Sequence, residues 1–481
     1  MKLKKIFSNG RINILLKYSS IKYIALIIAF LKGIVNAGAL GPELLGVLGN
    51  LLLILSYLSY SNLGILYSMN REYVIYESTN EKDKASKVIS TSFTALLVLS
   101  ILLIAAGIIA KFIYKDNLGN YILLVFIIGI LEQYRSFYIN YYRLVNKVRK
   151  INFIELINNV LSFVLIIISI KYFKIYSVLI AMFIADIIVF IYGYKNSEKI
   201  KLSIDKKVLK DLIIVGVPLL IYNLGFYILT TVDRLMTINF LGYRDLGYYT
   251  FSNQLVNGTM VFISSVLFLY YPKVIKNLYI NGNNDRRQIL KRIEQYTRYV
   301  EVLGVVLCLV GIILIKPFTN IILPKYSVSI DIYRILVFGG VFSEISYFAN
   351  VFTVSNKKQI YSVYLQCLAT AAAVILNYIF IESGMGIIGV SLATLMTNIL
   401  YSIMQHLIYL KILNLKISFI RNTLKVYLKF TSFTVICIAL SFININFILY
   451  IVTLSAITFI LYYRNLRNMI IDMGKLYRVS N

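Results

Sequence analysis

The sequence predicts an all-α protein that crosses a membrane about fourteen times. Hydrophobic residues make up 59% of the 481 residues and charged residues only 15%. Apolar runs recur along the whole chain, and each is long enough, at about 20 residues, to cross the hydrocarbon core of a bilayer as a helix. Taken between their flanking charges, these runs predict transmembrane helices at residues 19–39, 44–68, 88–113, 119–141, 152–170, 175–194, 212–239, 247–271, 298–316, 331–354, 360–381, 386–409, 424–443 and 447–463.

A repeated motif divides these helices into two sets. Residues 40–46 read LGPELLG and residues 241–247 read LGYRDLG, so the same pattern follows the first and the seventh helix. An Asn-Lys pair likewise follows the fourth helix and the tenth. Because the copies are six helices apart, an even number, both have the same orientation. The sequence therefore predicts an N-lobe at residues 1–200, a parallel C-lobe at residues 201–415, and two extra helices with a basic cytoplasmic tail at residues 416–481.

The distribution of basic residues predicts the orientation in the membrane. The chain carries 49 Lys and Arg residues against 21 Asp and Glu residues, a net charge of +28. If the N-terminus is inside, most of the basic residues fall in cytoplasmic segments, as the positive-inside rule requires. We therefore expect a multi-pass protein of a bacterial or archaeal cell membrane with both termini in the cytoplasm. Because the bases lie in short connections between spans, they do not indicate nucleic-acid binding.

The longest inner connection, at residues 272–297, contains the start of a basic amphipathic stretch from Arg286 to Arg298. One interpretation is a surface helix that lies on anionic lipid head groups. The other is a basic collar that gathers an anionic substrate at the cytoplasmic mouth.

Polar residues form a stripe along the first and the seventh helix. The repeat motif pairs Lys32 with Asp233, and both stripes have the 3, 4, 3, 4 spacing of one helical face. The stripes consist of Lys22, Ala25, Ala29, Lys32 and Asn36 in the first helix, and of Asn223, Phe226, Thr230, Asp233 and Thr237 in the seventh. A charge near the bilayer centre costs at least ~2.5 kcal/mol, so it needs a partner, water or a function.

The charges of the two stripes have alternative roles. Lys32 is expected to face a substrate cavity, whereas Lys22 either reaches the inner interface or joins Lys32. Asp233, with Arg234 beside it, either pairs with Lys32 across the two lobes or binds a coupling cation, Na⁺ or a proton.

Further ionisable residues lie inside predicted spans. Glu132 and Arg135 are three positions apart and can form an ion pair, which leaves both a local salt bridge and a cavity role open for Arg135. Asp186 and Glu344 are isolated acids, and such acids are candidates for coupling Na⁺ or protons. His406 lies near the inner end of the twelfth helix and is expected at the interface.

The sequence does not indicate an enzyme. It has no glycine loop for nucleotides, no Ser/His/Asp set and no sequence cluster of metal ligands. We expect no catalytic residue, no metal and no cofactor.

Several motifs carry a resemblance to a known family. The main pieces are Gly216-x-Pro218, Asp233-Arg234, Leu241-Gly242 and Leu246-Gly247-Tyr248-Tyr249, all within residues 215–255. Residues 40–46, Pro272, LPKYS at 323–327 and GIIGVSLAT at 386–394 extend them over nearly the whole chain. Together they resemble the polysaccharide transporter family, the oligosaccharide and O-antigen flippases of the superfamily of multidrug, oligosaccharidyl-lipid and polysaccharide exporters. Ala39 departs from that family, which usually has Arg there.

The resemblance implies a two-lobed, V-shaped flippase that moves undecaprenyl-diphosphate-linked oligosaccharide to the outer leaflet by alternating access, for export of cell-surface polysaccharide. Basic side chains would neutralise the diphosphate, and amides and hydroxyls would bind the sugars. The substrate-binding residues expected on these grounds are Lys22, Lys32, Asn36, Arg135, Asn223, Thr230, Arg234, Asn253 and Asn257. The expected partners are lipid-linked oligosaccharide, membrane lipids, Na⁺ or H⁺, and a glycan polymerase.

Three other functions compete with this one. A cation-coupled drug antiporter of the same superfamily would have an acid-dominated cavity and twelve helices, whereas Lys22, Lys32 and Arg135 lie in the first lobe and two spans are extra. A membrane polymerase or ligase would need a large outer loop, and the predicted outer connections are a few residues each. A scaffold for glycan assembly has no sequence feature that separates it from a transporter.

Overall fold

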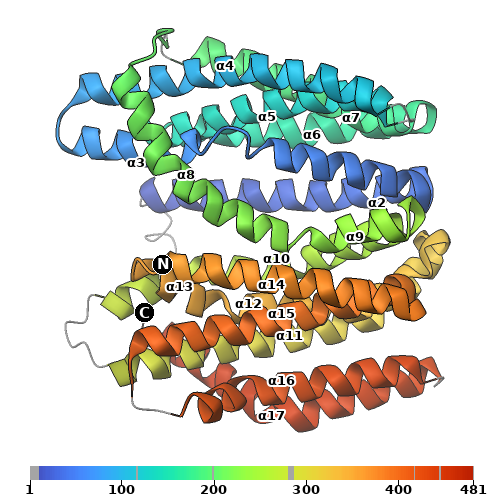
Figure 1. Ribbon diagram of the computed structural model, residues 1–481. Coiled ribbons are helices and arrows are strands. Elements are labelled where there is room, and N and C mark those ends of the chain that lie inside the picture. Colours follow the sequence, from blue (N-terminus) through green and yellow to red (C-terminus); the bar gives the residue numbers. More distant parts are fainter. Residues whose placement is uncertain are drawn as a thin grey trace. The chain divides into compact units, whose positions relative to one another are not determined.

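The computed structural model describes residues 10–114, 118–197, 200–279, 286–415, 418–443 and 446–479. These residues form helices and short connections with no β-strand among them, which confirms the predicted all-α class (Figure 1). The chain folds into two compact units, Met1–Leu224 and Gly225–Asn481. Their boundary lies inside a helix, and the predicted division at residues 200 and 415 stays a prediction.

The first unit consists of long helices around an aromatic centre. Its described helices are α2 (Gly10–Leu58), α3 (Ile65–Ser78), α4 (Lys82–Ile113), α5 (Gly119–Leu144), α6 (Val148–Phe173), α7 (Ile175–Asn196) and most of α8 (Lys206–Leu229). The ring of Phe93 on α4 lies 5.2 Å from Phe137 and 5.7 Å from Tyr134, both on α5. Phe190 of α7 packs edge-on against Tyr134 at 5.1 Å. These buried ring pairs join three helices and add to the energy of burial.

The second unit is arranged around α12. Its described helices are α9 (Val232–Phe240), α10 (Tyr243–Tyr279), α11 (Arg286–Ile322), α12 (Ser329–Ile345), α13 (Tyr347–Ser355), α14 (Gln359–Phe380), α15 (Gly386–Leu413), α16 (Phe419–Phe442) and α17 (Phe447–Val479). The helix α12 packs against α10, α11 and α15. The last two helices, α16 and α17, lie side by side, and both contact α11 (Figure 1). A pair of rings, Phe342 and Phe430 at 4.7 Å, joins α12 to α16.

The number of membrane spans agrees with the sequence. Eleven stretches of the described chain are long and apolar enough to cross a membrane. Two of them, Tyr23–Leu58 and Gln359–Leu413, are 36 and 55 residues long, and each covers two predicted helices. Gly41 divides the first, and Ile381–Met385 divides the second. The 37-residue helix α10 lies where a further span is predicted. The structure thus confirms a polytopic membrane protein with about fourteen spans.

The first glycine of the repeat motif has a positive φ in both copies. Gly41 has a φ of 72°, and its equivalent Gly242 has a φ of 90°. A Cβ atom added at either position would meet nothing within 4 Å. The left-handed backbone, and not a lack of space, therefore requires glycine at these two positions.

The predicted helix at 212–239 is interrupted in the structure. The helix α8 ends at Leu229, and α9 begins at Val232. Between them, the hydroxyls of Thr230 and Thr231 donate to the carbonyl of Tyr227 at 2.9 and 2.8 Å. Threonine hydroxyls compete in this way with the hydrogen bonds of a helix. The sequence prediction of one continuous helix was wrong because apolar composition continues through the break.

Two other predicted helices are also divided. The one at 44–68 ends at Leu58, and α3 begins at Ile65 after a turn in which Asn62 Oδ1 accepts a hydrogen bond from Gly64 N at 3.0 Å. The one at 331–354 is divided into α12 and α13 at Ser346. Local side-chain bonds again end a helix where hydropathy alone predicts that it continues.

Two helices extend further than predicted. The basic stretch from Arg286 to Arg298 is the first part of α11, so it is not a separate surface helix. Its buried residues Ile293, Thr297 and Val300 continue the face that α11 packs against its neighbours, which explains why the helix does not break. At the other end of the chain, α17 continues to Val479, where the sequence predicted a tail.

Candidate functional site

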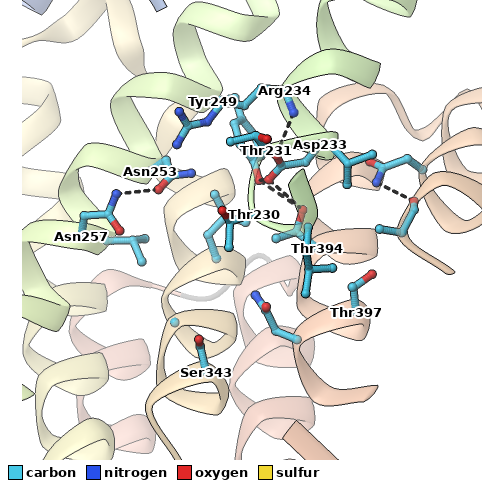
Figure 2. A pocket seen from close by; sticks show the side chains of 18 of the residues that line it. Thr230, Thr231, Asp233, Arg234, Tyr249, Asn253, Asn257, Ser343, Thr394 and Thr397 are labelled. Carbon is cyan, nitrogen blue, oxygen red and sulfur yellow. Dashed lines mark hydrogen bonds between the residues drawn. The ribbon is translucent and has the colours of Figure 1, made fainter. Parts of the chain in front are cut away.

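The second unit contains a polar cavity of about 330 Å³ at the break between α8 and α9. Side chains of α9, α10, α12, α14 and α15 complete its wall. Discontinuous helices suit such a site, because the free backbone groups at their ends can bind polar ligands. The break at Thr230 and Thr231 is thus part of the cavity wall (Figure 2).

Asp233 is the acid of this cavity and is almost completely buried. Its Oδ2 accepts hydrogen bonds from the hydroxyls of Tyr249 and of Thr394, the latter at 3.3 Å. Its Oδ1 accepts from the backbone N–H of Arg234 at 2.8 Å. These bonds, drawn in Figure 2, hold the carboxylate at the start of α9, where the positive end of the helix dipole also favours a negative charge.

Arg234 is the base of the cavity. Its side chain lines the wall next to Asp233, and its buried Nε has no hydrogen-bond partner among the described residues. A buried guanidinium donor without a partner costs free energy, so it favours a bound acceptor or water. Of the described residues that line the cavity, Arg234 and Asp233 are the only charged ones.

The remaining polar residues of the wall are uncharged. Two of the predicted ones, Asn253 and Asn257, lie one turn apart on α10, with Nδ2 of Asn257 donating to Oδ1 of Asn253 at 3.0 Å. The other amide and hydroxyl residues are Tyr227, Thr230, Thr231, Tyr249, Ser343, Asn377, Thr394, Thr397 and Asn398. Oδ1 of Asn377 and Oγ1 of Thr397 are buried without a partner among the described residues. The wall therefore offers both donors and acceptors to a neutral polar ligand.

The first unit contains a partly buried group of charges around Arg135. Nη1 of Arg135 bonds Asp186 Oδ1 at 3.1 Å, and Nη2 bonds Glu132 Oε1 at 2.9 Å. Nδ2 of Asn158 donates to the same Oδ1 of Asp186 at 2.7 Å. The predicted pair of Glu132 and Arg135 is present. Asp186, which the sequence treats as an isolated acid, is instead paired, because α7 places it against α5.

Lys32 lies beside this group. Its Nζ donates to Ser162 Oγ at 3.1 Å, and its charge interacts with those of Arg135, Asp186 and Glu132. Lys32 is half-buried, and the bond to a neutral hydroxyl leaves its charge without a direct carboxylate contact among the described residues. The helices α2 and α6, which carry Lys32 and Ser162, pack against each other.

The other predicted residues have local partners or lie outside the cavity. Asn223 belongs to the first unit and bonds the Leu219 carbonyl at 2.7 Å. Asn36 is buried, with its Oδ1 lacking a partner among the described residues. Glu344, treated as isolated in the sequence, accepts from Ser264 Oγ at 2.8 Å. Lys22 lies outside the residues whose side chains the structure describes.

His406 is buried between helices, and its expected position at the membrane interface stays a prediction. Only 4% of its surface is exposed. Its Nε2 donates to Oδ1 of Asn422 at 2.9 Å, and its ring packs against Tyr409 and Tyr427. The helix α16 covers His406, and hydropathy alone does not predict this contact.

A family model described as "Polysaccharide biosynthesis protein" matches residues 15–275, more than half of the chain. The chain belongs to this family. The match includes Lys32 and Arg135 in the first unit, and α9 and most of α10 in the second. No curated protein matches the sequence closely enough to count as a relative.

Solved transporter structures share the fold of this chain. The lipid II flippase MurJ in an inward closed conformation has a TM-score of 0.71 at 16% identity, over 94% of this chain and 99% of that one. An inward-facing multidrug resistance MATE family transporter of the MOP superfamily has a TM-score of 0.65 at 16% identity, over 83% of this chain and 98% of that one. The MATE transporter ClbM in complex with Rb⁺ has a TM-score of 0.54 at 16% identity, over 86% and 96%. These similarities establish the fold of the superfamily that the sequence motifs resemble.

Several wall residues of this family member were not predicted. Tyr249 and Thr394 bond Asp233, and Asn377 lies in the wall near them. Tyr249 belongs to the piece Leu246-Gly247-Tyr248-Tyr249 and Thr394 ends the motif at 386–394. Both pieces indicate the family and not the role of a single side chain. Asn377 has no sequence signal, because a single amide in an apolar helix has many possible roles.

Proposed function

We propose that this protein is a flippase that moves undecaprenyl-diphosphate-linked oligosaccharide from the cytoplasmic to the outer leaflet by alternating access. Membership of the polysaccharide biosynthesis protein family and the transporter fold support it. The observation that carries the proposal is the composition of the polar cavity, which combines one base and one acid with many amides and hydroxyls. Sites that bind sugars need such convergent uncharged donors and acceptors.

Each unit, taken by itself, contains one candidate group for the diphosphate of the cargo. In the second unit, Arg234 offers a guanidinium with an unused Nε, and a guanidinium binds phosphate oxygens well. In the first unit, Lys32 offers an ammonium that bonds only a hydroxyl in its described surroundings. Arg135 differs from both, since two carboxylates already match its charge. We therefore assign phosphate binding to Lys32 and Arg234, and a structural role to Arg135.

Asp233 is the proposed coupling acid. It is buried in the polar cavity, and all of the hydrogen bonds the structure gives its carboxylate come from neutral donors. A cation, Na⁺ or a proton, would compensate its charge, and binding would then depend on the ion gradient. Asp233→Asn should abolish ion-dependent transport while leaving cargo binding intact. Unchanged ion dependence in reconstituted Asp233→Asn would show that Asp233 is structural.

The proposed location is the cell membrane, with both termini in the cytoplasm. The apolar spans require a membrane, and the concentration of basic residues in alternate connections supports this orientation. A glycan polymerase that consumes the cargo outside is the proposed protein partner, since consumption would draw transport outward.

A cation-coupled antiporter for drugs or other small molecules is the second candidate. The buried Asp233 and the similarity to multidrug resistance MATE transporters favour it. A cationic drug would bind Asp233 and be repelled by Arg234, whereas a diphosphate would bind Arg234. The charge of the transported molecule therefore separates the two candidates.

Replacement of Lys32 tests the flippase proposal in cells. Lys32→Ala should reduce glycan on the cell surface and raise the amount of lipid-linked oligosaccharide in the inner leaflet, at unchanged protein level. Lys32→Arg should retain more activity because the charge is kept. Ser162→Ala, which removes the hydroxyl partner of Lys32 and no charge, is the matched control. Full glycan display with Lys32→Ala would exclude Lys32 from the site.

A further inference from the structure

A second cavity, of about 320 Å³, lies in the second unit between α11, α16 and α17. Its wall includes three bases, Lys291 and Arg298 of α11 and Lys425 of α16, and one acid, Glu294. Asn465 of α17 also contributes to the wall. The wall thus carries a net positive charge, and it shares no residue with the polar cavity around Asp233.

Buried hydrogen bonds hold part of this wall in place. Glu294 is buried, and its Oε2 accepts from Lys425 Nζ at 2.8 Å. Its Oε1 accepts from Asn422 Nδ2 at 2.7 Å, and Oδ1 of Asn422 in turn accepts from His406. The side chain of Lys425 is nonetheless 54% exposed, so its ammonium can meet a second anion. A fixed, partly exposed base is what an anion site requires.

The surroundings of the cavity are apolar and exposed. Leu424 and Leu428 flank Lys425 on α16 and are 50% and 59% exposed. Ile460 of α17, five positions before Asn465, is 78% exposed. In a membrane protein such side chains face lipid tails. The cavity therefore opens where basic groups meet the lipid-facing surface.

The length of α11 places this cavity near the membrane interface. A helix of 37 residues extends about 55 Å, and the hydrocarbon core is only ~30 Å thick. Lys291 and Arg298 lie before the middle of α11, toward its N-terminal end, so they fall near the head groups on the side that the sequence predicts to be cytoplasmic. That leaflet is the anionic one, and basic pockets between helices on this side bind phosphate head groups.

We propose that this cavity binds the phosphate head group of an anionic phospholipid, with the acyl chains along Leu424, Leu428 and Ile460. At ~30 Å³ per water, the cavity has space for about ten waters, enough for a phosphate and glycerol. Lys291, Arg298 and Lys425 bind the phosphate, and Asn465 bonds the glycerol. The lipid joins α16 and α17 to α11. This binding is independent of the proposed transport of lipid-linked oligosaccharide.

The wall favours a phospholipid over the glycan carrier. Its uncharged polar residues are few, Gln295, Tyr299 and Asn465, whereas the polar cavity around Asp233 has many amides and hydroxyls for sugars. A diphosphate, a phospholipid and free phosphate share the same chemistry, so the experiment must separate them.

Thermal unfolding of the full chain in a neutral detergent tests the proposal. Phosphatidylglycerol should raise the unfolding temperature more than phosphatidylcholine does. Lys291→Gln combined with Arg298→Gln should remove this difference and weaken the apparent affinity for phosphatidylglycerol at least about tenfold. Both side chains are exposed, so the variant should unfold at the wild-type temperature without lipid. Lys291→Arg with Arg298→Lys keeps the charges and should keep the lipid response.

The matched control is Lys358→Gln combined with Lys411→Gln, an equal loss of charge at exposed positions outside the cavity. It should respond to phosphatidylglycerol as the wild type does. An equal loss of response in this control, or a full response in the Lys291→Gln and Arg298→Gln variant, would overturn the proposal. The proposal would also be overturned if inorganic phosphate competed as strongly as the lipid. The same holds if only undecaprenyl diphosphate raised the unfolding temperature in a way that depends on these charges.

Discussion

At the scale of single residues, the structure separates charges that are satisfied from charges that are available. Arg135 has two carboxylate partners, whereas Lys32 bonds a hydroxyl and Arg234 keeps a buried Nε without a described partner. Burying an ion pair gains little by itself, but removing one member leaves a costly unpaired charge. The first kind of residue therefore affects stability, and the second kind affects binding.

Replacement of Arg135 should destabilise the protein. Arg135→Gln leaves Glu132 and the fully buried Asp186 without their cation, at an expected cost of about 3 to 5 kcal/mol. Adding Asp186→Asn removes one of these charges and should restore part of the stability. Thermal unfolding of the purified variants measures both effects. Wild-type stability of Arg135→Gln together with a loss of transport would show instead that Arg135 binds cargo.

The sequence predicted one part of the site and missed another for a physical reason. Asn253 and Asn257 line the polar cavity together because they are four positions apart on one face of α10, whereas Thr230, Asp233 and Arg234 line it around the break before α9. Thr394 and Asn377 come from α15 and α14, and only the packing of those helices against α9 brings them near. Asp186 was misjudged for the same reason, since its partner lies on another helix.

At the scale of elements, short breaks in the helices form part of the cavity wall and allow close packing of two helices. The break between α8 and α9 exposes the carboxylate of Asp233 to the cavity, and the turn before α3 brings two backbones into contact. A Cβ atom on Gly64 would lie 2.2 Å from the carbonyl oxygen of Gly216. Hydropathy cannot predict such breaks, since the residues on both sides are apolar.

Substitution of Gly64 and of Gly41 should separate the effect of close backbone contact from the effect of backbone strain alone. Gly64 has left-handed helical backbone (φ 76°, ψ 4°), where Ala costs about 1 to 2 kcal/mol. Gly41 (φ 72°, ψ 173°) lies in a region that essentially only glycine adopts, where strain costs about 1 to 3 kcal/mol. Gly64→Ala should lower the unfolding temperature further than Gly41→Ala, because only Gly64 also meets a backbone atom. Equal effects of the two substitutions in thermal unfolding would show that α3 and α8 can move apart without cost.

The start of α8 should show a dependence on pH. Oδ1 of Asp205 accepts from the backbone N–H of Val208 and of Lys207, and Oδ2 accepts from Lys87. The hydrogen bond from the Val208 N–H lowers the pKa of Asp205 below its ordinary value of 3.8, and the bond from Lys87 lowers this pKa by the next largest amount. A carboxyl whose pKa is lower in the folded state stabilises the fold above its unfolded pKa, and that contribution is lost as the pH falls through the folded pKa.

We therefore expect Asp205→Ala to unfold with a weaker dependence on pH below about 4, the unfolded pKa of Asp. Lys87→Gln should have a smaller effect of the same sign, because the bonds from the backbone N–H groups remain. Thermal unfolding between about pH 6 and 3 measures the difference. Identical pH profiles of Asp205→Ala and wild type would contradict this assignment.

At the scale of the whole molecule, composition and repetition predicted most of the fold. The all-α class, the approximate number of spans and the equivalence of Gly41 and Gly242 are confirmed, because bilayer thickness fixes helix length and a tight turn fixes glycine. The structure of the basic stretch before residue 298 was not predicted correctly, because its amphipathic pattern suits both a surface helix and the extended α11.

Cysteine labelling tests the predicted orientation. After replacement of the native Cys308, Cys367 and Cys437, a cysteine at Ser383 should react with a membrane-impermeant reagent from outside. A cysteine at Asn80 should react only after permeabilisation. Both positions are exposed, so accessibility depends on the side of the membrane. The reverse pattern would place the termini outside.

The most direct test of the proposed flippase is outward movement of its cargo in vesicles. Purified protein is reconstituted with fluorescently labelled undecaprenyl-diphosphate disaccharide, and a membrane-impermeant quencher reports how much cargo changes leaflet. We predict that wild type moves the cargo much faster than protein-free vesicles, that Arg234→Gln is slower, and that a cationic drug does not compete. Cargo movement no faster than in protein-free vesicles, with transport of the cationic drug by the same protein, would contradict the flippase and favour the antiporter.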